Sequence, residues 1–184
     1  IISALKLDLS KPDFEAYTAE IGILYHEINI AIRNLKKWMS PRKVPTPIFL
    51  QPARGFIYPM PKGVVLIISP WNYPFQLAIS PLIGAIAAGN CVVLKPSNKS
   101  LNVSKIISKI IIETFDGDYI SVIEGPGSEV IDSLIKNNRF DHIFFTGSVD
   151  VGKKIMELAA RHLTTVTLEL GGKSPVIVHN DADL

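Results

Sequence analysis

The chain has 184 residues, of which 47% are hydrophobic and 20% charged, a composition typical of soluble globular proteins and unlike that of disordered chains. Its 19 basic and 17 acidic residues form no dense basic block, so we expect no nucleic-acid partner. A single cysteine cannot form an internal disulfide, which favours a reducing, cytoplasmic location. Residues 1–10 lack the pattern of a secretory signal, and no apolar run is long enough to predict membrane contact.

The first predicted element is a helix from Asp13 to Met39. Ser10 and Pro12 mark its start, and Pro41 ends it. Its apolar residues recur at a spacing that places them on one helix face. These residues are Phe14, Tyr17, Ile21, Leu24, Ile28, Leu35 and Trp38.

A proline-rich segment follows and is expected to project from the core as a β-hairpin arm. The predicted strands are Ile48–Gln51 and Gly55–Tyr58, joined by a corner at Pro52–Arg54.

After Gly63, short continuous apolar runs alternate with segments of helical periodicity. The runs are Val64–Ile68, Cys91–Leu94, Ile120–Ile123, His142–Phe145 and Val166–Leu170. The helical segments are Phe75–Ala88, Ser100–Phe115, Ser128–Asn137 and Ser148–His162. Strands of unbroken Val, Ile and Leu are covered on both faces, and alternation with helices implies parallel strands. The prediction is a doubly wound, Rossmann-like α/β fold.

The expected organisation has four parts. Residues 1–43 form an N-terminal helical segment, 44–60 the arm, 61–168 a dinucleotide-binding domain, and 169–184 the start of a second, catalytic α/β domain. In doubly wound sheets ligands bind beyond the carboxyl ends of the strands. The residues that follow each apolar run are therefore the candidates for function.

The loops after the first two runs can each be interpreted in two ways, as functional or as ordinary structure. In the first, Pro70 and Pro74 stiffen a loop that carries Trp71 and Asn72, and a rigid amide can donate a hydrogen bond to a developing oxyanion. The alternative is an ordinary turn with Trp71 packed in the core. After the second run, Lys95 stands where dinucleotide folds commonly have an acidic residue. Its alternative is a solvated lysine at a strand end.

The next two runs end in glycine-containing turns. Gly125 belongs to a tight turn that we interpret first as structural and second as a wall of a cofactor site. Gly147 and Ser148 begin a helix whose free backbone N–H groups suit a pyrophosphate, although Ser148 is also an ordinary N-cap.

Glu169 ends the fifth run and precedes Gly171 and Gly172, which allow close approach of a ligand or backbone. Burial would raise the pKa of its carboxyl group and suit it for general-base catalysis. The alternative is an ion pair with Lys173 or another cation.

Four separate motifs of this chain resemble, in order and spacing, the NAD(P)-dependent aldehyde dehydrogenase family, most closely its class 3, fatty-aldehyde-type branch. They are Pro70-Trp71-Asn72-Tyr73-Pro74, the segment 87–97 (AAGNCVVLKPS), Phe145-Thr146-Gly147-Ser148, and the segment 168–175 (LELGGKSP). The resemblance runs from near Asp13 to the end of the chain.

The resemblance implies roles for particular residues. Asn72 would supply the side-chain part of an oxyanion hole and Glu169 the general base, Lys95 would hold the adenine ribose, and Ser148 would meet the pyrophosphate of NAD or NADP. The residues expected at the cofactor site are Ser69, Pro70, Trp71, Lys95, Ser97, Asn98, Gly125, Phe145, Thr146, Gly147, Ser148, Leu170 and Gly171. In this family a cysteine thiolate attacks the aldehyde, hydride passes to the nicotinamide, and activated water hydrolyses a thioester.

No residue of this chain is expected to replace that thiolate or to bind a metal. Cys91 lies inside an apolar strand and upstream of Lys95, so we expect it in the core. The four histidines show no metal-ligand spacing. Because the chain stops shortly after the strand-like Pro175–Val178, we expect a fragment that lacks the nucleophile. The segment Pro45–Pro59 of the arm resembles the family segment that contributes to subunit contacts, which implies a homodimeric parent, expected in the cytoplasm and acting on a small aldehyde.

Asn98 departs from the family, which commonly has a glutamate there to grip the ribose diol. Its neutral side chain would not repel a 2′-phosphate, which predicts acceptance of NADP as well as NAD. Two other functions stay open. One is a non-catalytic dinucleotide-binding or assembly module. The other is an acyl-phosphate or coenzyme A-dependent reductase, against which Glu169 argues because such an enzyme needs no base to activate water.

Overall fold

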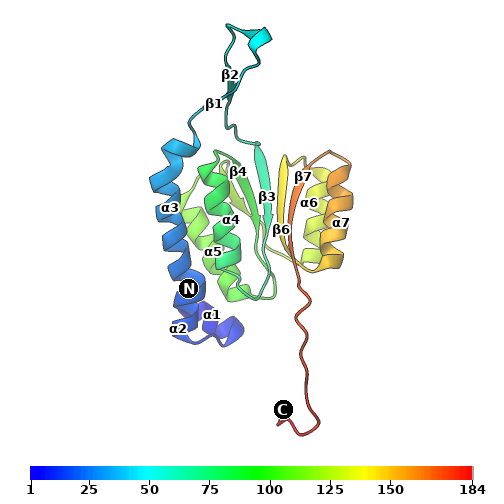
Figure 1. The fold of residues 1–184 in the computed structure, drawn as a ribbon. Coiled ribbons are helices and arrows are strands. Elements are labelled where there is room, and N and C mark those ends of the chain that lie inside the picture. The colour runs from blue at the N-terminus through cyan, green and yellow to red at the C-terminus, as the bar shows by residue number, and fades with distance from the viewer. Residues whose placement is uncertain (184) are drawn as a thin grey trace.

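A sheet of five parallel strands forms the centre of the molecule in the computed structural model, which describes residues 1–183 (Figure 1). The strands are β3 (Val64–Ile68), β4 (Cys91–Lys95), β5 (Ile120–Val122), β6 (His142–Gly147) and β7 (Thr165–Leu170). Their order across the sheet is β5-β4-β3-β6-β7. All five predicted strands are confirmed, with small differences at their ends.

Four helices connect these strands and cover the two faces of the sheet. They are α4 (Gln76–Ala87), α5 (Leu101–Thr114), α6 (Gly127–Asn137) and α7 (Val149–Ala160). Each lies within two residues of its predicted bounds at both ends. The doubly wound α/β prediction is therefore confirmed.

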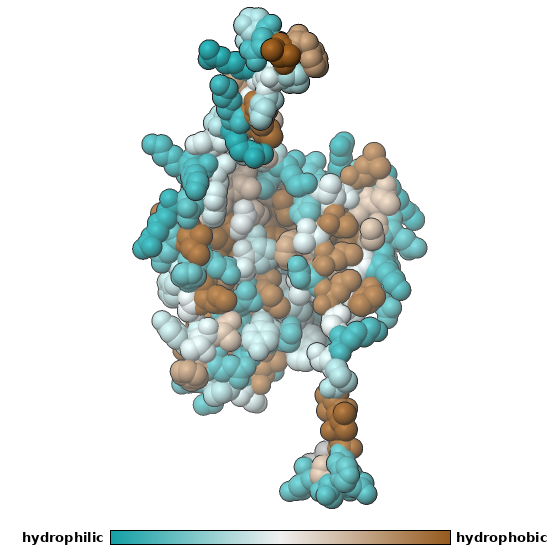
Figure 2. Space-filling model, in the orientation of Figure 1, coloured by the Kyte–Doolittle hydropathy of each residue, from teal (hydrophilic) through white to brown (hydrophobic). Residues whose placement is uncertain are grey.

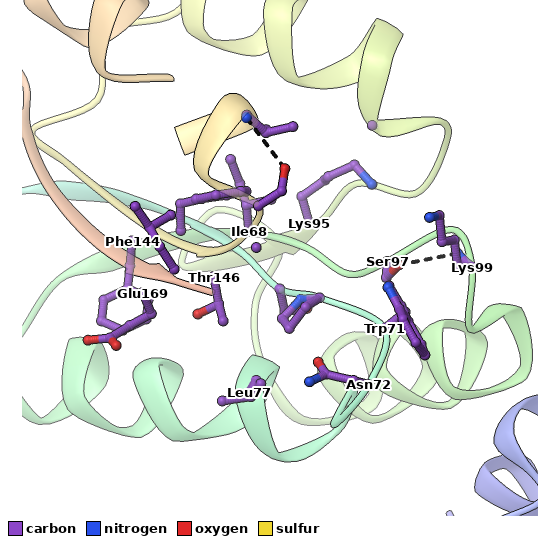
Figure 3. A pocket seen from close by; sticks show the side chains of 18 of the residues that line it. Ile68, Trp71, Asn72, Leu77, Lys95, Ser97, Lys99, Phe144, Thr146 and Glu169 are labelled. Carbon is purple, nitrogen blue, oxygen red and sulfur yellow. Dashed lines mark hydrogen bonds between the residues drawn. The ribbon is translucent and has the colours of Figure 1, made fainter. Parts of the chain in front are cut away.

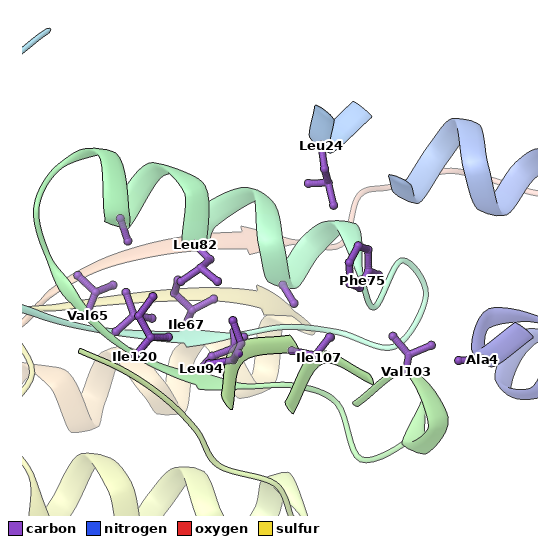
Figure 4. Close-up of a cluster of buried hydrophobic side chains, with 14 of the residues drawn as sticks. Ala4, Leu24, Val65, Ile67, Phe75, Leu82, Leu94, Val103, Ile107 and Ile120 are labelled. Carbon is purple, nitrogen blue, oxygen red and sulfur yellow. The ribbon is translucent and has the colours of Figure 1, made fainter. Parts of the chain in front are cut away.

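The side chains of β3 alternate between two hydrophobic cores, because successive residues of a strand point to opposite faces. Val65 and Ile67 belong to a cluster with α4, α5 and the N-terminal helices, part of which is drawn in Figure 4. Leu66 and Ile68 belong to a second cluster with α6 and α7. Burial on both faces explains why β3 reads as an unbroken apolar run.

The N-terminal segment contains a helix that the sequence pattern did not predict and a second one that differs from expectation. The unpredicted helix is α1 (Ile2–Leu9). The expected helix continues through α2 (Asp13–Glu15), a π-helical segment η1 (Ala16–Ile21) and α3 (Gly22–Trp38). The wider π turn rotates the following residues, so the predicted apolar face is not continuous. Phe14 is exposed, whereas Leu24 is buried.

The arm is a hairpin, but its first strand was predicted in the wrong place. β1 (Arg42–Val44) pairs in antiparallel fashion with β2 (Gly55–Ile57), and Ile48–Leu50 forms a 3₁₀ turn, η2, at the tip. Pro45 and Pro47 have no N–H group to donate to a strand ladder, which explains why pairing stops at Val44. Figure 1 shows the arm at the amino-terminal end of the strands.

Beyond β7 the chain leaves the sheet at its opposite, carboxyl-terminal end as an extended segment, residues 171–183. Val176, Ile177 and Val178 are exposed there, and Figure 2 shows the hydrophobic band that they form. β7 itself continues to Leu170, so the strand crosses the expected boundary between residues 168 and 169. Within residues 1–183, no helix is both long and apolar enough to span a bilayer.

The start of β3 depends on a glycine turn fixed by two side chains. Gly63 has a φ of +125°. Asn90 Oδ1 accepts hydrogen bonds from the backbone N–H groups of Lys62 and Gly63 at 2.7 and 3.0 Å. Asp141 Oδ2 accepts one from Val64 N at 2.9 Å. A Cβ atom at position 63 would collide with the Asp141 carboxylate.

Gly63→Ala is expected to lower the free energy of unfolding by about 1–3 kcal/mol, because alanine is strained at this φ and would displace Asp141. Urea unfolding of the chain, followed by circular dichroism, measures this change. Gly117→Ala is the matched control, since open space surrounds Gly117, and its effect should stay below about 1 kcal/mol. Equal effects of the two substitutions would contradict this account of the turn.

Candidate functional site

The order of the strands creates a crevice at the carboxyl-terminal edge of the sheet. From β3 the chain moves through β4 to β5 on one side, and from β6 to β7 on the other. The loops that follow β3 and β6 therefore diverge, which is where doubly wound folds bind ligands. A cavity of about 850 Å³ opens at this point (Figure 3). Its volume lies within the range of about 300–1,000 Å³ found for small-molecule sites.

Nearly all of the predicted site residues line this cavity. Both predicted catalytic residues and every predicted cofactor residue except Gly125 lie on its walls. Sequence reasoning missed further lining residues, namely Ile68, Leu77, Ser80, Pro81, Lys99, Gly127, Ile131, Phe144 and Val151. Most of these belong to helices or to the strand interior and could have been found only from the predicted position of α4 and α6 against the sheet.

The loop between β3 and α4 forms one wall. Trp71 is 49% exposed and lines the cavity, so its alternative interpretation as a core residue is wrong. Asn72 is also exposed, and Figure 3 shows both side chains on the side of the pocket opposite Glu169. The amide of Asn72 is therefore available to a ligand in the cavity.

A buried ion pair from the N-terminal segment holds this loop. The Lys11 ammonium and the Glu20 carboxylate are in direct contact, and both side chains are buried. Lys11 Nζ also donates to the backbone oxygen of Asn72 at 2.9 Å. Sequence reasoning missed both residues, although Ala16, Glu20 and Leu24 are spaced by four, which places a glutamate on a buried helix face.

Lys95 is buried at the end of β4, with 2% of its surface exposed, and the alternative of a solvated lysine is wrong. Its Nζ atom donates to the backbone oxygens of Pro96 and Gly125, each at 2.9 Å. Burial lowers the pKa of the Lys95 ammonium below its ordinary value. The two carbonyl groups fix this amine at the cavity wall and leave its third proton for a ligand.

Gly125 does not line the cavity itself. Its contribution is the carbonyl oxygen that accepts from Lys95, and its φ of +128° favours glycine in that turn. The prediction of Gly125 as a cofactor wall is therefore corrected to a support for Lys95.

The end of β6 supplies the opposite wall and a helix N-terminus. Ser148 is the N-cap of α7, and its Oγ accepts from Val151 N at 3.5 Å. At Gly147 a Cβ atom would lie 2.5 Å from the Phe145 ring, so the backbone and the ring are in close contact there. The first N–H groups of α7 point out of the helix toward the crevice, where an anion would be stabilised.

Two buried hydroxyl groups at the cavity make no hydrogen bond within residues 1–183. They are Ser69 Oγ, after β3, and Thr146 Oγ1, in β6. Both residues line the cavity. Both oxygen atoms are buried behind the cavity surface, as is Ser100 Oγ away from the cavity, so their lack of a partner does not by itself indicate a ligand.

Glu169 lines the cavity, but the expectation that it is buried is wrong. It pairs in register with Thr146 on the sheet face of β6 and β7 that carries His142 and Thr165. α4 and α5 cover this face over β3, β4 and β5 but do not extend over β7, so Glu169 is exposed. Its alternative as a partner of Lys173 is not observed, since no ion pair joins the two residues.

A second cavity of about 430 Å³ adjoins the first between α6 and α7. Asn98, Lys99, Gly127, Ile131 and Val151 line both cavities. The two lysines that line the second cavity, Lys99 and Lys154, differ in whether they form an ion pair. Lys154 Nζ contacts Asp132 Oδ1 at 2.8 Å, and this hydrogen bond is the main cause that lowers the Asp132 pKa. Lys99 forms no ion pair with any residue from 1 to 183.

Cys91 lies far from this chemistry. It begins β4 and pairs in register with Val64, at the amino-terminal end of the sheet. Its side chain is half-buried, so the expected full burial in the core is corrected. As the only cysteine of the sequence, it leaves the crevice without a thiol from this chain.

The sequence matches the profile of the aldehyde dehydrogenase family over residues 1–184. It is 51% identical over 184 residues to 4,4′-diaponeurosporen-aldehyde dehydrogenase of Staphylococcus aureus, covering all of this chain and 40% of that protein. It is 48% identical over 184 residues to aldehyde dehydrogenase family 3 member A2 of Macaca fascicularis, of which it covers 38%. The chain thus spans about two fifths of the length of these relatives.

Solved structures agree with these matches. A substrate-bound structure of Staphylococcus aureus AldH superposes with a TM-score of 0.91 at 51% sequence identity, covering 98% of this chain and 39% of that one. Betaine aldehyde dehydrogenase from Staphylococcus aureus, solved in complex with NAD⁺, superposes with a TM-score of 0.80 at 33% identity. This match covers 98% of the chain and 35% of the compared structure.

The lowered pKa of Lys95 predicts a pH-dependent stability. Between the lowered pKa and the ordinary value of 10.5, the unfolded state binds more protons at this position than the folded state, so the free energy of unfolding rises with pH. Lys95→Met abolishes this contribution. The wild-type minus K95M difference in unfolding free energy, measured by urea titration from pH 8 to 10.5, should therefore increase with pH. A difference that is constant or decreases would contradict the burial of a charged amine.

Proposed function

The chain belongs to the aldehyde dehydrogenase family, and we propose that it forms the nicotinamide-cofactor-binding part of an enzyme that oxidises an aldehyde to a carboxylic acid with NAD⁺ or NADP⁺. The observation that carries this proposal is the crevice between β3 and β6, where Lys95 and the N-terminus of α7 face one cavity. A buried amine and a helix N-terminus are the donors expected for a ribose and a pyrophosphate.

Residues on each wall of the cavity would hold the cofactor. Lys95 would donate its third proton to the adenine ribose, and the backbone at Gly147 and Ser148 would receive the pyrophosphate. The bound cofactor would supply the hydride acceptor of the reaction.

Asn72 and Glu169 would act on the substrate. The Asn72 amide would donate a hydrogen bond to the aldehyde oxygen as negative charge develops on it, a contribution worth about a hundredfold or more in rate at similar sites. Glu169 would accept a proton from the water that hydrolyses the acyl intermediate. The two side chains lie on opposite sides of the crevice, as an oxyanion donor and a water-activating base require (Figure 3).

The surroundings of Asn98 favour the use of both cofactors. Asn98 is neutral and exposed, and the adjacent Lys99 is a cation free of ion pairs within the described chain. The second cavity that they line offers space beside the ribose position. A 2′-phosphate at this position would therefore lie near the positive charge of Lys99, and neither Asn98 nor Lys99 carries a carboxylate that would repel it.

The assembly and location of the whole protein are also part of the proposal. The arm exposes Ile48, Phe49, Phe56 and Met60 at the end of the molecule farthest from the crevice, where a second copy would cover them. A homodimer with a small-molecule aldehyde substrate in the cytoplasm is the arrangement we propose.

Cofactor binding tests the proposal directly. We expect NAD to bind to the chain in isothermal titration calorimetry and Lys95→Met to weaken this binding about tenfold or more, through loss of one charged hydrogen bond. Lys153→Met is the matched control, because Lys153 is exposed on α7 and lies outside the cavity. Absence of NAD binding, or an equal loss in both variants, would refute the proposed site.

NAD and NADP should both bind to the chain. We expect the dissociation constants of NAD and NADP to differ by less than about a hundredfold. Asn98→Glu should weaken NADP selectively, because a carboxylate would repel the 2′-phosphate. Asn98→Gln, which keeps the site neutral, should preserve the ratio. A wild-type preference for NAD above that limit would disprove dual use.

The chain of residues 1–184 should bind NAD without reducing it. No thiol of these residues lies at the crevice, so a mixture with NAD and a medium-chain aldehyde should show no growth of absorbance at the wavelength of the reduced cofactor. Cys91→Ser should change nothing. Sustained turnover of about one per second or more would contradict the account.

A further inference from the structure

The contacts of Lys11 and Glu20 converge on a single segment, the loop from Ser69 to Phe75 that joins β3 to α4. Lys11 Nζ donates to Asn72 O at 2.9 Å and lies 3.7 Å from the centre of the Tyr73 ring. Glu20 Oε2 accepts from the backbone N–H groups of Phe75 and Gln76, at 2.9 and 3.0 Å. The remaining carboxylate oxygen of Glu20 contacts Lys11.

Glu20 acts as the missing cap of α4. The first N–H groups of any helix lack partners within the helix, and no side chain of the α4 N-terminus caps them. A carboxylate that accepts two of these N–H groups satisfies them and also interacts favourably with the positive end of the helix dipole. The start of α4 is therefore fixed by a residue more than fifty positions earlier in the chain.

The π-helical segment explains how Glu20 reaches this point. Glu20 lies within η1, and Ala16 and Glu20 are completely buried. At Gly22, directly after η1, a Cβ atom would lie 3.2 Å from Tyr17 O, so the backbone is crowded there. Isolated π turns in α-helices are frequent at functional sites, where they redirect a side chain.

A buried ion pair is weak evidence for a purely stabilising role. The cost of removing two charges from water commonly cancels their attraction, and apolar replacements are often as stable. Here every additional hydrogen bond of the pair is made to the backbone of the loop that presents Trp71 and Asn72 to the crevice, or to Gln76 at the start of α4. The pair therefore determines where that loop lies.

We propose that Lys11 and Glu20 are positioning residues that hold the β3–α4 loop so that the Asn72 amide stays directed into the crevice. This inference rests on the proposed function only for the role of Asn72. Lys11 fixes the backbone of Asn72 itself, and Glu20 fixes the helix start that follows the loop. Neither residue lines the cavity, so they act on the reaction through the loop alone.

The first test measures the loop without reference to activity. Hydrogen exchange followed by mass spectrometry should show exchange about tenfold or more faster at Phe75 and Gln76 in Lys11→Met and Glu20→Gln, because the hydrogen bonds from their N–H groups to residue 20 open more often. Peptides from β6 should exchange as in the wild type. Lys109→Met is the matched control, since its partner Glu113 is 3.8 Å away on an exposed helix face. Lys11→Arg should restore much of the protection.

The second test uses the whole protein with an aldehyde and NAD⁺. Lys11→Met should lower kcat by about 10- to 100-fold, the effect of a misplaced catalytic group. The dissociation constant of NAD should change less than kcat does, because Lys95 and Ser148, the proposed contacts to the ribose and the pyrophosphate, lie outside this loop. In an Asn72→Ala background, Lys11→Met should have little further effect on kcat, since the group that it positions is gone.

The outcomes separate this inference from the proposed function. Wild-type exchange at Phe75 and Gln76 in a folded Lys11→Met or Glu20→Gln protein overturns the inference, whatever the activity. Faster exchange with unchanged kcat in an active protein also overturns it. A whole protein that exchanges as expected but oxidises no aldehyde supports the holding of the loop and refutes the proposed function instead. If Lys11→Met fails to fold, Glu20→Gln, which keeps the side-chain shape, gives the same readings.

Discussion

The reversal of strand order between β3 and β6 is the constraint on which the rest of the structure depends. Two parallel strands that lie side by side, with connections leaving in opposite directions, leave a gap at their carboxyl ends that no crossover helix can fill. Polar residues can occupy this edge because it is open, whereas the strand interiors must stay apolar on both faces. The chemistry of the chain is consequently concentrated in the loops after β3, β4, β6 and β7.

Two buried lysines fix the positions of loops at this edge of the sheet. Lys95 is held by carbonyl groups from its own loop and from the turn at Gly125, and Lys11 is held by Glu20. Each is removed from water, and each donates at least one hydrogen bond to the backbone of a loop at the crevice. A buried cation must keep its partners, so these bonds restrict the loops more strongly than exposed contacts would.

The sequence predicted the sheet and most of the cavity because both follow from local patterns. Apolar runs such as Val64–Ile68 identify buried strands, and Lys95 and Ser148 follow such runs directly. The failures have non-local causes. Glu169 is exposed because α4 and α5, which cover its sheet face over β3, β4 and β5, do not extend over β7. β1 ends where prolines interrupt the ladder. Glu20, the partner of Lys11, lies in a π-helical segment, which the periodicity of apolar residues does not predict. The position of Asn72 depends in turn on the contact between Lys11 and Glu20.

A crystal structure of the protein grown with NAD tests the central claim most directly, namely that the crevice is a dinucleotide site. The account predicts density along the carboxyl edge of the sheet, with the pyrophosphate at the N-terminus of α7 and a ribose hydroxyl within hydrogen-bond distance of Lys95 Nζ. A dinucleotide bound elsewhere on the molecule, with this crevice filled only by water, would contradict it.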